Sequence, residues 1–169
     1  MKLSEEQKKK MTEYYNYISN KMYGNKTKKE RQKMGMFFTP SELGIQMLEK
    51  FESLTEEDTV LDQTCGCGLL LAYSIIAGAK PEKCFGVELD PEMVRIAKSE
   101  LGKLGVPEYN IHWGNALNRE CFYFPESPYD DTFPRHDIIY SFSCDLENKK
   151  DLGKVQFFNK DGTEYIHFI

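Results

Sequence analysis

Residues 59–71, Thr-Val-Leu-Asp-Gln-Thr-Cys-Gly-Cys-Gly-Leu-Leu-Leu, constrain the fold of this chain more than any other stretch. They predict a short buried strand at Val60 and Leu61 that ends at Asp62, a turn with two glycines, and a helix that begins at once. Glycines let a backbone approach a ligand closely, and the N–H groups at a helix start favour polar or anionic groups. The stretch therefore indicates a ligand site, although by itself it is also compatible with a turn that only reverses the chain.

The rest of the chain predicts alternating helices and strands. A helix over 4–22 begins with a Ser4-to-Gln7 capping box, and a second helix is expected to be capped by Thr39, with Pro40 in its first position and Glu42 completing a capping box. Its expected buried stripe is Leu43, Met47, Leu48 and Phe51. Further helices are predicted over 69–77 and from residue 90 to about residue 105, and strands over 84–88, 110–113 and 137–142.

Strands that alternate with helices predict a parallel, doubly wound α/β sheet with ligands at the carboxyl ends of its strands. Residues 154–169 depart from this alternation, because two apolar alternating segments flank an Asp161-Gly162 turn. This pattern predicts a hairpin that finishes the sheet antiparallel. Residues 118–136 form a long aromatic and acidic loop, which is either a lid or an insertion.

Length and composition narrow the class of protein. A chain of 169 residues, 40% hydrophobic, is expected to form one globular core. Its sequence contains no membrane-length apolar run and begins without a signal peptide, so we expect a cytoplasmic protein. The five cysteines have neither disulfide nor zinc spacing, so reduced thiols and no metal are expected.

Positive charge is concentrated at the N-terminus. Residues 1–33 contain ten Lys or Arg and four Glu, a net charge of +6, whereas residues 34–169 contain twelve basic and 23 acidic residues, a net charge of −11. We therefore divide the chain into a basic helical arm and connector, 1–33, and an α/β domain, 34–169. The arm either contacts DNA phosphates or is a solvated helix face followed by a flexible lysine-rich connector.

Four motifs occur in a fixed order: Phe-Phe-Thr-Pro at 37–40, Leu-Asp-Gln-Thr-Cys-Gly-Cys-Gly at 61–68, Gly-Val-Glu-Leu-Asp at 86–90 and Gly-Asn-Ala-Leu at 114–117. Together they resemble the S-adenosylmethionine-dependent adenine-N6 DNA methyltransferases, of the kind found in phages and in type I modification subunits. The resemblance covers roughly residues 30 to 142. It implies a Rossmann-like class I methyltransferase sheet, shortened, with an N-terminal helical arm and a C-terminal β-hairpin.

The resemblance also implies a set of S-adenosylmethionine-binding residues. Phe38 and Thr39 would border the methionine end, Glu88 would accept the ribose hydroxyls, and Asn115 matches a position, usually Asp, that reads the amino group of the cofactor's adenine. The complete expected set is Phe38, Thr39, Asp62, Thr64, Gly66, Gly68, Glu88, Leu89, Asn115 and Ala116. Gln63 and Cys67 depart from the family, which usually has Pro and often Ser or Thr there.

The catalytic motif of that family is not matched. Its members carry Asn-Pro-Pro-Tyr or Asn-Pro-Pro-Phe at the end of the fourth strand, where the Asn and a proline carbonyl accept from the target amino group. In this chain Phe142, Ser143, Cys144 and Asp145 occupy the corresponding place. The catalytic residues are therefore unknown, and we expect weak or no adenine methylation by the chain alone. Residues 127–129, Ser-Pro-Tyr, are a faint candidate for a displaced motif.

Three functions remain open at this stage. The chain is a small adenine-N6 methyltransferase with an altered catalytic loop, a catalytically silent cofactor- or partner-binding subunit, or a methyltransferase whose different substrate binds at 118–136. No module that reads DNA bases is evident in the sequence. A protein partner or self-association is thus expected to supply target recognition, and no contact with a membrane is expected.

Overall fold

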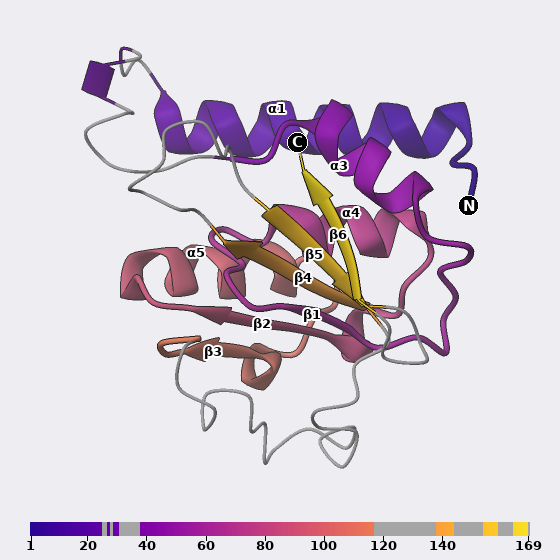
Figure 1. Ribbon diagram of the computed structural model, residues 1–169. Coiled ribbons are helices and arrows are strands. Elements are labelled where there is room, and N and C mark those ends of the chain that lie inside the picture. Colours follow the sequence, from indigo (N-terminus) through magenta and orange to yellow (C-terminus); the bar gives the residue numbers. More distant parts are fainter. Residues whose placement is uncertain are drawn as a thin grey trace.

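The structure, a computed structural model, describes residues 1–24, 27, 29–30 and 38–116. It also describes the backbone of three later strands: β4 (Ile138–Ser143), β5 (Lys154–Phe158) and β6 (Glu164–Phe168). With β1 (Val60–Asp62), β2 (Cys84–Glu88) and β3 (Ile111–Trp113) they form a six-stranded sheet in the order β3-β2-β1-β4-β5-β6. β1 lies parallel to β2 and β4, and β2 lies parallel to β3. The fold is the Rossmann-like α/β sheet that the sequence predicts (Figure 1).

The C-terminal hairpin is confirmed. β5 pairs antiparallel with β4 and with β6, so the hairpin completes the sheet by antiparallel pairing: β5 runs opposite to the parallel strands, and β6 runs in their direction. β1 lies between β2 and β4, and the chain therefore leaves β1 toward one side of the sheet and later returns on the other. Such a reversal of strand order opens a crevice at the carboxyl ends of the strands, where ligands bind in open α/β sheets.

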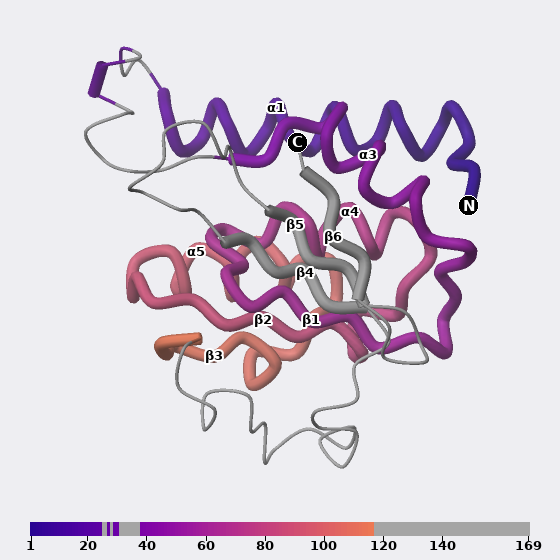
Figure 2. The backbone as a smooth tube through the Cα atoms, in the orientation of Figure 1, coloured from indigo at the N-terminus to yellow at the C-terminus, as the bar shows by residue number. Residues whose placement is uncertain are grey.

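The helices are α1 (Glu5–Tyr23), α3 (Ser41–Glu49), α4 (Leu69–Ala77) and α5 (Pro91–Gly102), with the short 3₁₀ turns η1 (Pro81–Lys83) and η2 (Glu108–Asn110). α4 packs against β1 and β2, and α5 packs against β2 and β3. α1 packs in turn on α3 and α4, and in Figures 1 and 2 it runs along the outer side of this helical layer. The predicted helix and strand positions are confirmed to within about one to three residues at their ends.

α1 is part of the hydrophobic core. Ser4 and Gln7 form the predicted capping box, and Met11 and Ile18 are completely buried. The side-chain Nε2 of Gln7 also donates to the carbonyl oxygens of Ile76 at 3.2 Å and Ala77 at 3.1 Å, which belong to the last turn of α4. The helix is thus fixed to the α/β layer at its beginning and through its buried face, while a domain boundary at residue 33 stays a prediction.

The predicted start of α3 is wrong by one residue. The N-cap is Pro40 rather than Thr39, it has an extended backbone, and no side chain caps the helix. Long-range contacts hold this end instead: the carbonyl oxygen of Thr39 accepts from the Tyr73 hydroxyl at 3.2 Å, and Thr12 Oγ1 bonds to Ser41 Oγ at 3.3 Å. These tertiary contacts override the local capping preference of the Thr-Pro-Ser-Glu sequence.

Two predictions from the sequence, the nature of the 118–136 loop and the absence of a membrane-spanning segment, involve residues outside the described part of the chain. The 118–136 loop lies outside the described residues, so whether it is a lid or an insertion stays open. Among the helices of the described part, none is long and apolar enough to cross a membrane.

Candidate cofactor site

The glycine turn between β1 and α4 folds back onto the end of β2. The Cys65 N–H donates to the Val87 carbonyl oxygen at 2.9 Å, and the Gly66 N–H donates to Glu88 Oε2 at 2.8 Å. A Cβ atom on Gly86 would lie 2.8 Å from Cys65 Sγ, closer than side chains pack, so only glycine allows the turn to lie this close to β2. The turn is consequently fixed before any ligand arrives.

The two glycines of the turn have different surroundings. Both have positive φ angles, 54° at Gly66 and 89° at Gly68. A Cβ atom on Gly68 would lie 2.6 Å from Leu101 Cδ1, so this glycine is needed for the packing of α4 against α5. A Cβ atom on Gly66 would meet nothing within 4 Å. Gly66 is therefore the point at which the turn exposes its backbone to open space.

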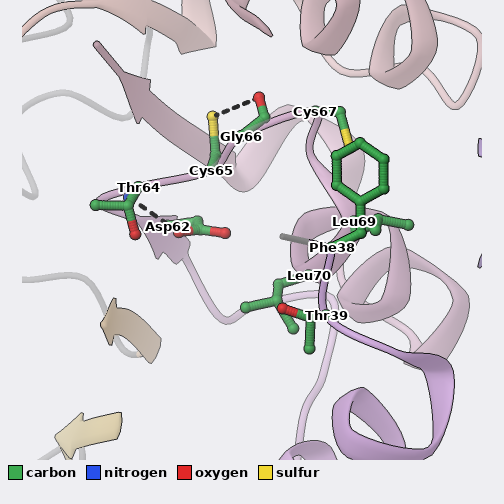
Figure 3. Close-up of a pocket in the computed structure, with 9 residues that line it drawn as sticks. All are labelled: Phe38, Thr39, Asp62, Thr64, Cys65, Gly66, Cys67, Leu69 and Leu70. Atoms are coloured by element: carbon green, nitrogen blue, oxygen red, sulfur yellow. Dashed lines mark hydrogen bonds between the residues drawn. The ribbon is translucent and has the colours of Figure 1, made fainter. Parts of the chain in front are cut away.

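That space is a hollow of about 60 Å³ between the turn and the start of α3 (Figure 3). It is lined by Phe38, Thr39, Asp62, Thr64, Cys65, Gly66, Cys67, Leu69 and Leu70. Five of the predicted site residues therefore meet here, although they come from two segments more than 20 residues apart: Phe38, Thr39, Asp62, Thr64 and Gly66. Gly68 does not line the hollow, and it begins α4 as the N-cap.

Sequence reasoning missed four lining residues: Cys65, Cys67, Leu69 and Leu70. The two cysteines alternate with the predicted residues of the turn, and the two leucines belong to the first turn of α4. The only sequence signal for them is their position inside the same motif. The first-turn N–H groups of a helix lack carbonyl partners one turn earlier, so this end of α4 adds backbone donors beside an otherwise apolar wall.

The remaining predicted residues are Glu88, Leu89, Asn115 and Ala116. They lie at the ends of β2 and β3 and do not line the hollow. The Gly114 N–H donates to the Glu88 carbonyl oxygen at 2.9 Å, and Trp113 Nε1 donates to the Leu89 carbonyl oxygen at 2.9 Å. Leu89 and Trp113 are each 64% exposed, and Asn115 is exposed as well. The tips of β2 and β3 thus carry two exposed apolar side chains next to the Glu88 carboxylate.

Glu88 already has partners within the protein. Its Oε2 accepts from Gly66 N–H and its Oε1 accepts from Asp90 N–H, each at 2.8 Å. A carboxylate has about four acceptor positions, so these two bonds leave capacity for the hydroxyls of a ligand. Glu88 therefore fixes the glycine turn, whether or not it also binds a ribose.

Asp62 is 3% exposed and accepts from the Thr64 N–H at 3.1 Å. Burial raises the pKa of its carboxyl to about 7, against the opposing effect of the Thr64 hydrogen bond, and the nearby Glu88 charge adds to the rise. Near neutral pH the Asp62 side chain is therefore divided between its protonated and ionised forms. Its carboxyl group can therefore either donate or accept a hydrogen bond in the hollow.

The cysteines of the turn are not activated. Burial raises the pKa of Cys67 to about 12 and that of Cys65 well above its ordinary value. Thiols with such pKa values are almost entirely protonated at neutral pH and are poor nucleophiles and metal ligands. Within the described residues, no group of His, Cys, Asp and Glu side chains is arranged to hold a metal ion.

The position of the family's catalytic motif falls at the end of β4. Phe142 and Ser143 are the last residues of that strand, which ends one residue later than predicted, while Cys144 and Asp145 lie outside the described residues. Asp62 pairs with Tyr140, so β4 continues beyond the end of β1 toward this position. Phe142 and Ser143 therefore lie on β4 beyond the level of Asp62, at the same end of the sheet as the glycine turn.

The sheet order and the glycine-turn hollow define an α/β protein with a Rossmann-like sheet and a hollow at the carboxyl end of β1. The family profile described as N-6 DNA Methylase matches residues 6–141, and the chain belongs to this family. The matched range ends before Phe142, Ser143, Cys144 and Asp145, so the family assignment does not depend on these four residues.

Among curated proteins, the chain is 28% identical over 137 residues to the type II methyltransferase M.VspI of Vibrio sp. (strain 343). The match covers 76% of this chain and 34% of that protein, so the chain spans about a third of the length of this relative. Among solved structures, a precorrin-6y C5,15-methyltransferase from Geobacter metallireducens GS-15 overlaps 60% of this chain and 48% of its own, at 20% identity and a TM-score of 0.40. An overlap of that quality adds nothing to what the sheet itself shows.

Proposed function

We propose that this chain binds S-adenosylmethionine at the ends of β1, β2 and β3, as the cofactor-binding part of a DNA adenine-N6 methyltransferase-like protein. The observation that carries the proposal is the open side of Gly66, which faces a hollow lined by residues from two of the four motifs. Because the turn is already tied to β2, it offers a preformed surface rather than one that a ligand must order.

The size of the hollow indicates how the ligand would lie. About 60 Å³ is too small for a ligand that joins an amino acid to a nucleoside, since complete small-molecule sites usually measure several hundred Å³. The hollow would hold the methionine end, with Asp62 and the start of α4 supplying polar groups. The nucleoside would extend along the tips of β2 and β3, where Glu88 has free acceptor capacity and Leu89 is exposed.

When bound, S-adenosylmethionine would supply a methyl group on a positively charged sulfur. The side chains around the hollow would bind and orient the ligand, and Asp62 is the one among these lining residues that could take up a proton near neutral pH. None of them is assigned the role of accepting hydrogen bonds from a target amino group. In the family that role belongs to the motif that Phe142, Ser143, Cys144 and Asp145 replace. We therefore propose weak or no adenine methylation by this chain alone.

The mismatch at Phe142–Asp145 favours a second candidate, a catalytically silent cofactor- or partner-binding subunit. A methyltransferase that acts on another substrate would instead use residues 118–136, which lie outside the described residues. The assay below separates the adenine-N6 methyltransferase from both of these candidates, because neither of them transfers a methyl group to adenine in DNA.

The test is a calorimetric titration of the purified chain with S-adenosylmethionine, followed by transfer of a labelled methyl group to adenine-containing duplex DNA. We expect saturable binding and little or no transfer. The matched control is Gly66→Val, whose branched side chain would enter the hollow and should abolish binding. Absence of binding by the unmodified chain would refute the proposed function. Robust transfer would refute the weak-activity part and would direct attention to residues 127–129.

Contact with DNA is proposed for residues 1–33, and the ion pairs of α1 bear on where it would occur. Lys8 pairs with Glu5 and Glu49, Lys9 with Glu13 and Lys10 with Glu6. Much of the positive charge of α1 is therefore compensated by neighbouring carboxylates. We propose that phosphate contacts depend on the lysine-rich connector after α1 more than on the helix.

Salt dependence tests this proposal. Replacing the basic residues of 26–33 by Gln should flatten the decrease of duplex-DNA affinity with rising salt, whereas Lys9→Gln together with Lys10→Gln should change it little. If the unmodified chain and both variants show the same salt dependence, the connector does not contact DNA phosphates. Recognition of a target sequence is assigned to a protein partner or a second copy, which light scattering of the chain with and without DNA would detect as a change in mass.

A further inference from the structure

The end of α1 contacts the hollow through a pair of aromatic rings. The Tyr23 and Phe38 rings are stacked, with centroids 4.7 Å apart and planes 29° from parallel. Tyr23 is the last residue of α1, and Phe38 is one of the residues that line the hollow (Figure 3). Stacked rings at this separation attract each other beyond the burial of their area. The stack therefore joins a helix outside the predicted site to one wall of that site.

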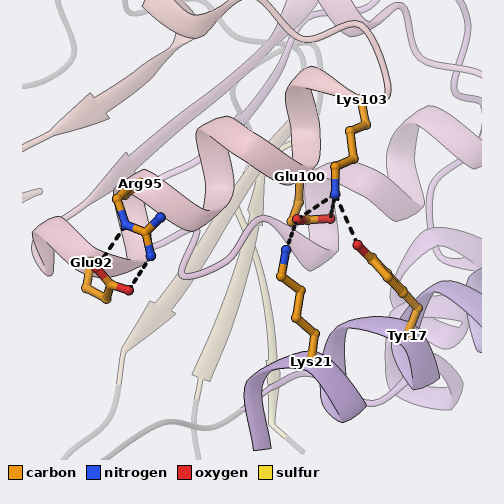
Figure 4. Close-up of polar contacts among 6 residues, drawn as sticks. All are labelled: Tyr17, Lys21, Glu92, Arg95, Glu100 and Lys103. Atoms are coloured by element: carbon orange, nitrogen blue, oxygen red, sulfur yellow. Dashed lines mark hydrogen bonds and ion pairs between the residues drawn. The ribbon is translucent and has the colours of Figure 1, made fainter.

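Tyr23 is held in place independently of Phe38. Two residues earlier, Lys21 forms an ion pair with Glu100 of α5, a carboxylate whose side chain is fully buried. Lys103 bonds to the same carboxylate at 2.8 and 2.9 Å and to the Tyr17 hydroxyl at 3.1 Å (Figure 4). The last two turns of α1 are thus fixed to α5 by a shared buried charge, immediately before Gly24 ends the helix.

On the C-terminal side of Phe38, hydrogen bonding and packing fix the backbone. The Thr39 carbonyl oxygen accepts from the Tyr73 hydroxyl, and α3 begins two residues later. Gly44 of α3 packs directly on the Tyr73 ring, since a Cβ atom there would lie 2.4 Å from it. These contacts place the main chain of residues 39–44. The half-buried Phe38 ring packs against the hydrophobic core, and the stack with Tyr23 adds a second contact that orients it.

We propose that Tyr23 is a positioning residue for the cofactor site, which holds the Phe38 ring against the hollow and so makes α1 a structural part of that site. This inference rests on the proposed binding of S-adenosylmethionine. It assigns to Tyr23 no contact with the ligand, and it requires an aromatic ring at position 23 rather than a hydroxyl group.

Calorimetric titration of S-adenosylmethionine into Tyr23→Ala, Tyr23→Phe and Tyr109→Ala tests the proposal. Tyr109 is 40% exposed and belongs to η2, before the start of β3 and thus at the edge of the sheet opposite the hollow. We expect the Kd to rise about three- to tenfold in Tyr23→Ala, the range that corresponds to loss of one aromatic stack. Tyr23→Phe and Tyr109→Ala should bind within about twofold of the unmodified chain, because both keep the stack.

Equal affinity of Tyr23→Ala and the unmodified chain would overturn the proposal, and so would a Tyr23→Phe variant as weak as Tyr23→Ala. A second measurement needs no ligand: amide hydrogen exchange of the free proteins. Tyr23→Ala should speed exchange of the amides at Phe38 and Thr39 while amides in the middle of α5 keep their rates. If the unmodified chain fails to bind, the proposed function is refuted, and unchanged exchange at Phe38 would separately refute the positioning role.

Discussion

The Gly66 N–H donates to Glu88 Oε2 at 2.8 Å, so a side chain adds to the backbone bond from the Cys65 N–H to the Val87 carbonyl oxygen in holding the turn after β1 on the end of β2. The other oxygen of Glu88 accepts from the Asp90 N–H, which begins α5. One carboxylate thus connects the glycine turn, the end of β2 and the start of the next helix. Its removal should affect the shape of the site as well as any bond to a ribose.

Glu88→Ala and Glu88→Gln separate these two effects. The alanine variant leaves two N–H groups without their acceptor and should lose about 1–3 kcal/mol of unfolding free energy without ligand. The glutamine variant keeps one acceptor oxygen and should lose less. Urea unfolding measures this loss. If Glu88 also accepts ribose hydroxyls, calorimetry will show that Glu88→Gln loses more free energy of S-adenosylmethionine binding than it loses in unfolding free energy. Unchanged affinity would show that Glu88 does not contact the ligand.

Gly66 and Gly68 should respond differently to the same substitution. An alanine at either position is strained by the positive φ angle, at a cost of about 1 kcal/mol. Gly68→Ala also drives its Cβ into Leu101 and should lose about 1–3 kcal/mol more in unfolding free energy. Gly66→Ala meets open space, so its main effect should be on ligand binding. Thermal unfolding and calorimetry of both variants check this, and the reverse order of stabilities would show that the turn packs differently.

Much of this fold follows from local sequence. The capping box of Ser4 and Gln7, the apolar strand at 84–88 and the Asp161-Gly162 hairpin signal are each contained within a few residues, and the structure has the corresponding elements where they predict them. The start of α3 could not be predicted in this way. It depends on Tyr73 and Thr12, which are about 30 residues away in the sequence and leave no local signal.

The candidate site is predicted only in part for the same reason. Phe38 and Asp62 were assigned from motifs, and the structure brings them to one hollow. Leu70 lines that hollow because of the direction in which α4 leaves the turn, which composition does not reveal. The stack of Tyr23 on Phe38 depends on the packing of α1, and in the sequence Tyr23 is only the last aromatic residue of an amphipathic helix.

Asp62 should make stability fall as the pH rises toward neutrality. Its pKa is raised from an ordinary value of 3.8 to about 7, so the folded state holds a proton that the unfolded state releases between these values. The contribution is complete below about pH 4 and is lost as the pH approaches 7. Asp62→Asn should therefore flatten the decrease in unfolding free energy between pH 4 and 7. Urea unfolding at several pH values measures it, and an identical profile in the variant would contradict the assigned pKa.

Trp113 offers a spectroscopic measure of the ligand. It is the only tryptophan of the chain, and its indole Nε1 donates to the carbonyl oxygen of Leu89, one of the residues assigned to the cofactor. S-adenosylmethionine bound along the ends of β2 and β3 should change the fluorescence of this exposed ring in a saturable way. The Kd from fluorescence should agree with the calorimetric value. Binding by calorimetry without any change in fluorescence would place the ligand away from Leu89.

Glu100 should act on stability in the opposite pH range from Asp62. Burial raises the pKa of this carboxyl, but hydrogen bonds from Lys103, Lys21 and Tyr17 outweigh burial and lower the pKa below its ordinary value. The folded state therefore binds the proton less readily than the unfolded state, so the stabilisation is complete above about pH 4.5 and is lost as the pH falls through the lowered pKa.

Glu100→Gln keeps the shape of the side chain and removes its charge, and it should lose about 1–3 kcal/mol of unfolding free energy at pH 7, because charged hydrogen bonds in a buried position are replaced by weaker ones. The loss should shrink as the pH falls below about 4.5. The matched control is Glu92→Gln on the same helix, whose partner Arg95 is at the surface (Figure 4). That exposed pair should contribute less than about 1 kcal/mol. Equal losses in the two variants, measured by urea unfolding at pH 7 and pH 4, would show that the Glu100 cluster does not fasten α1 to α5.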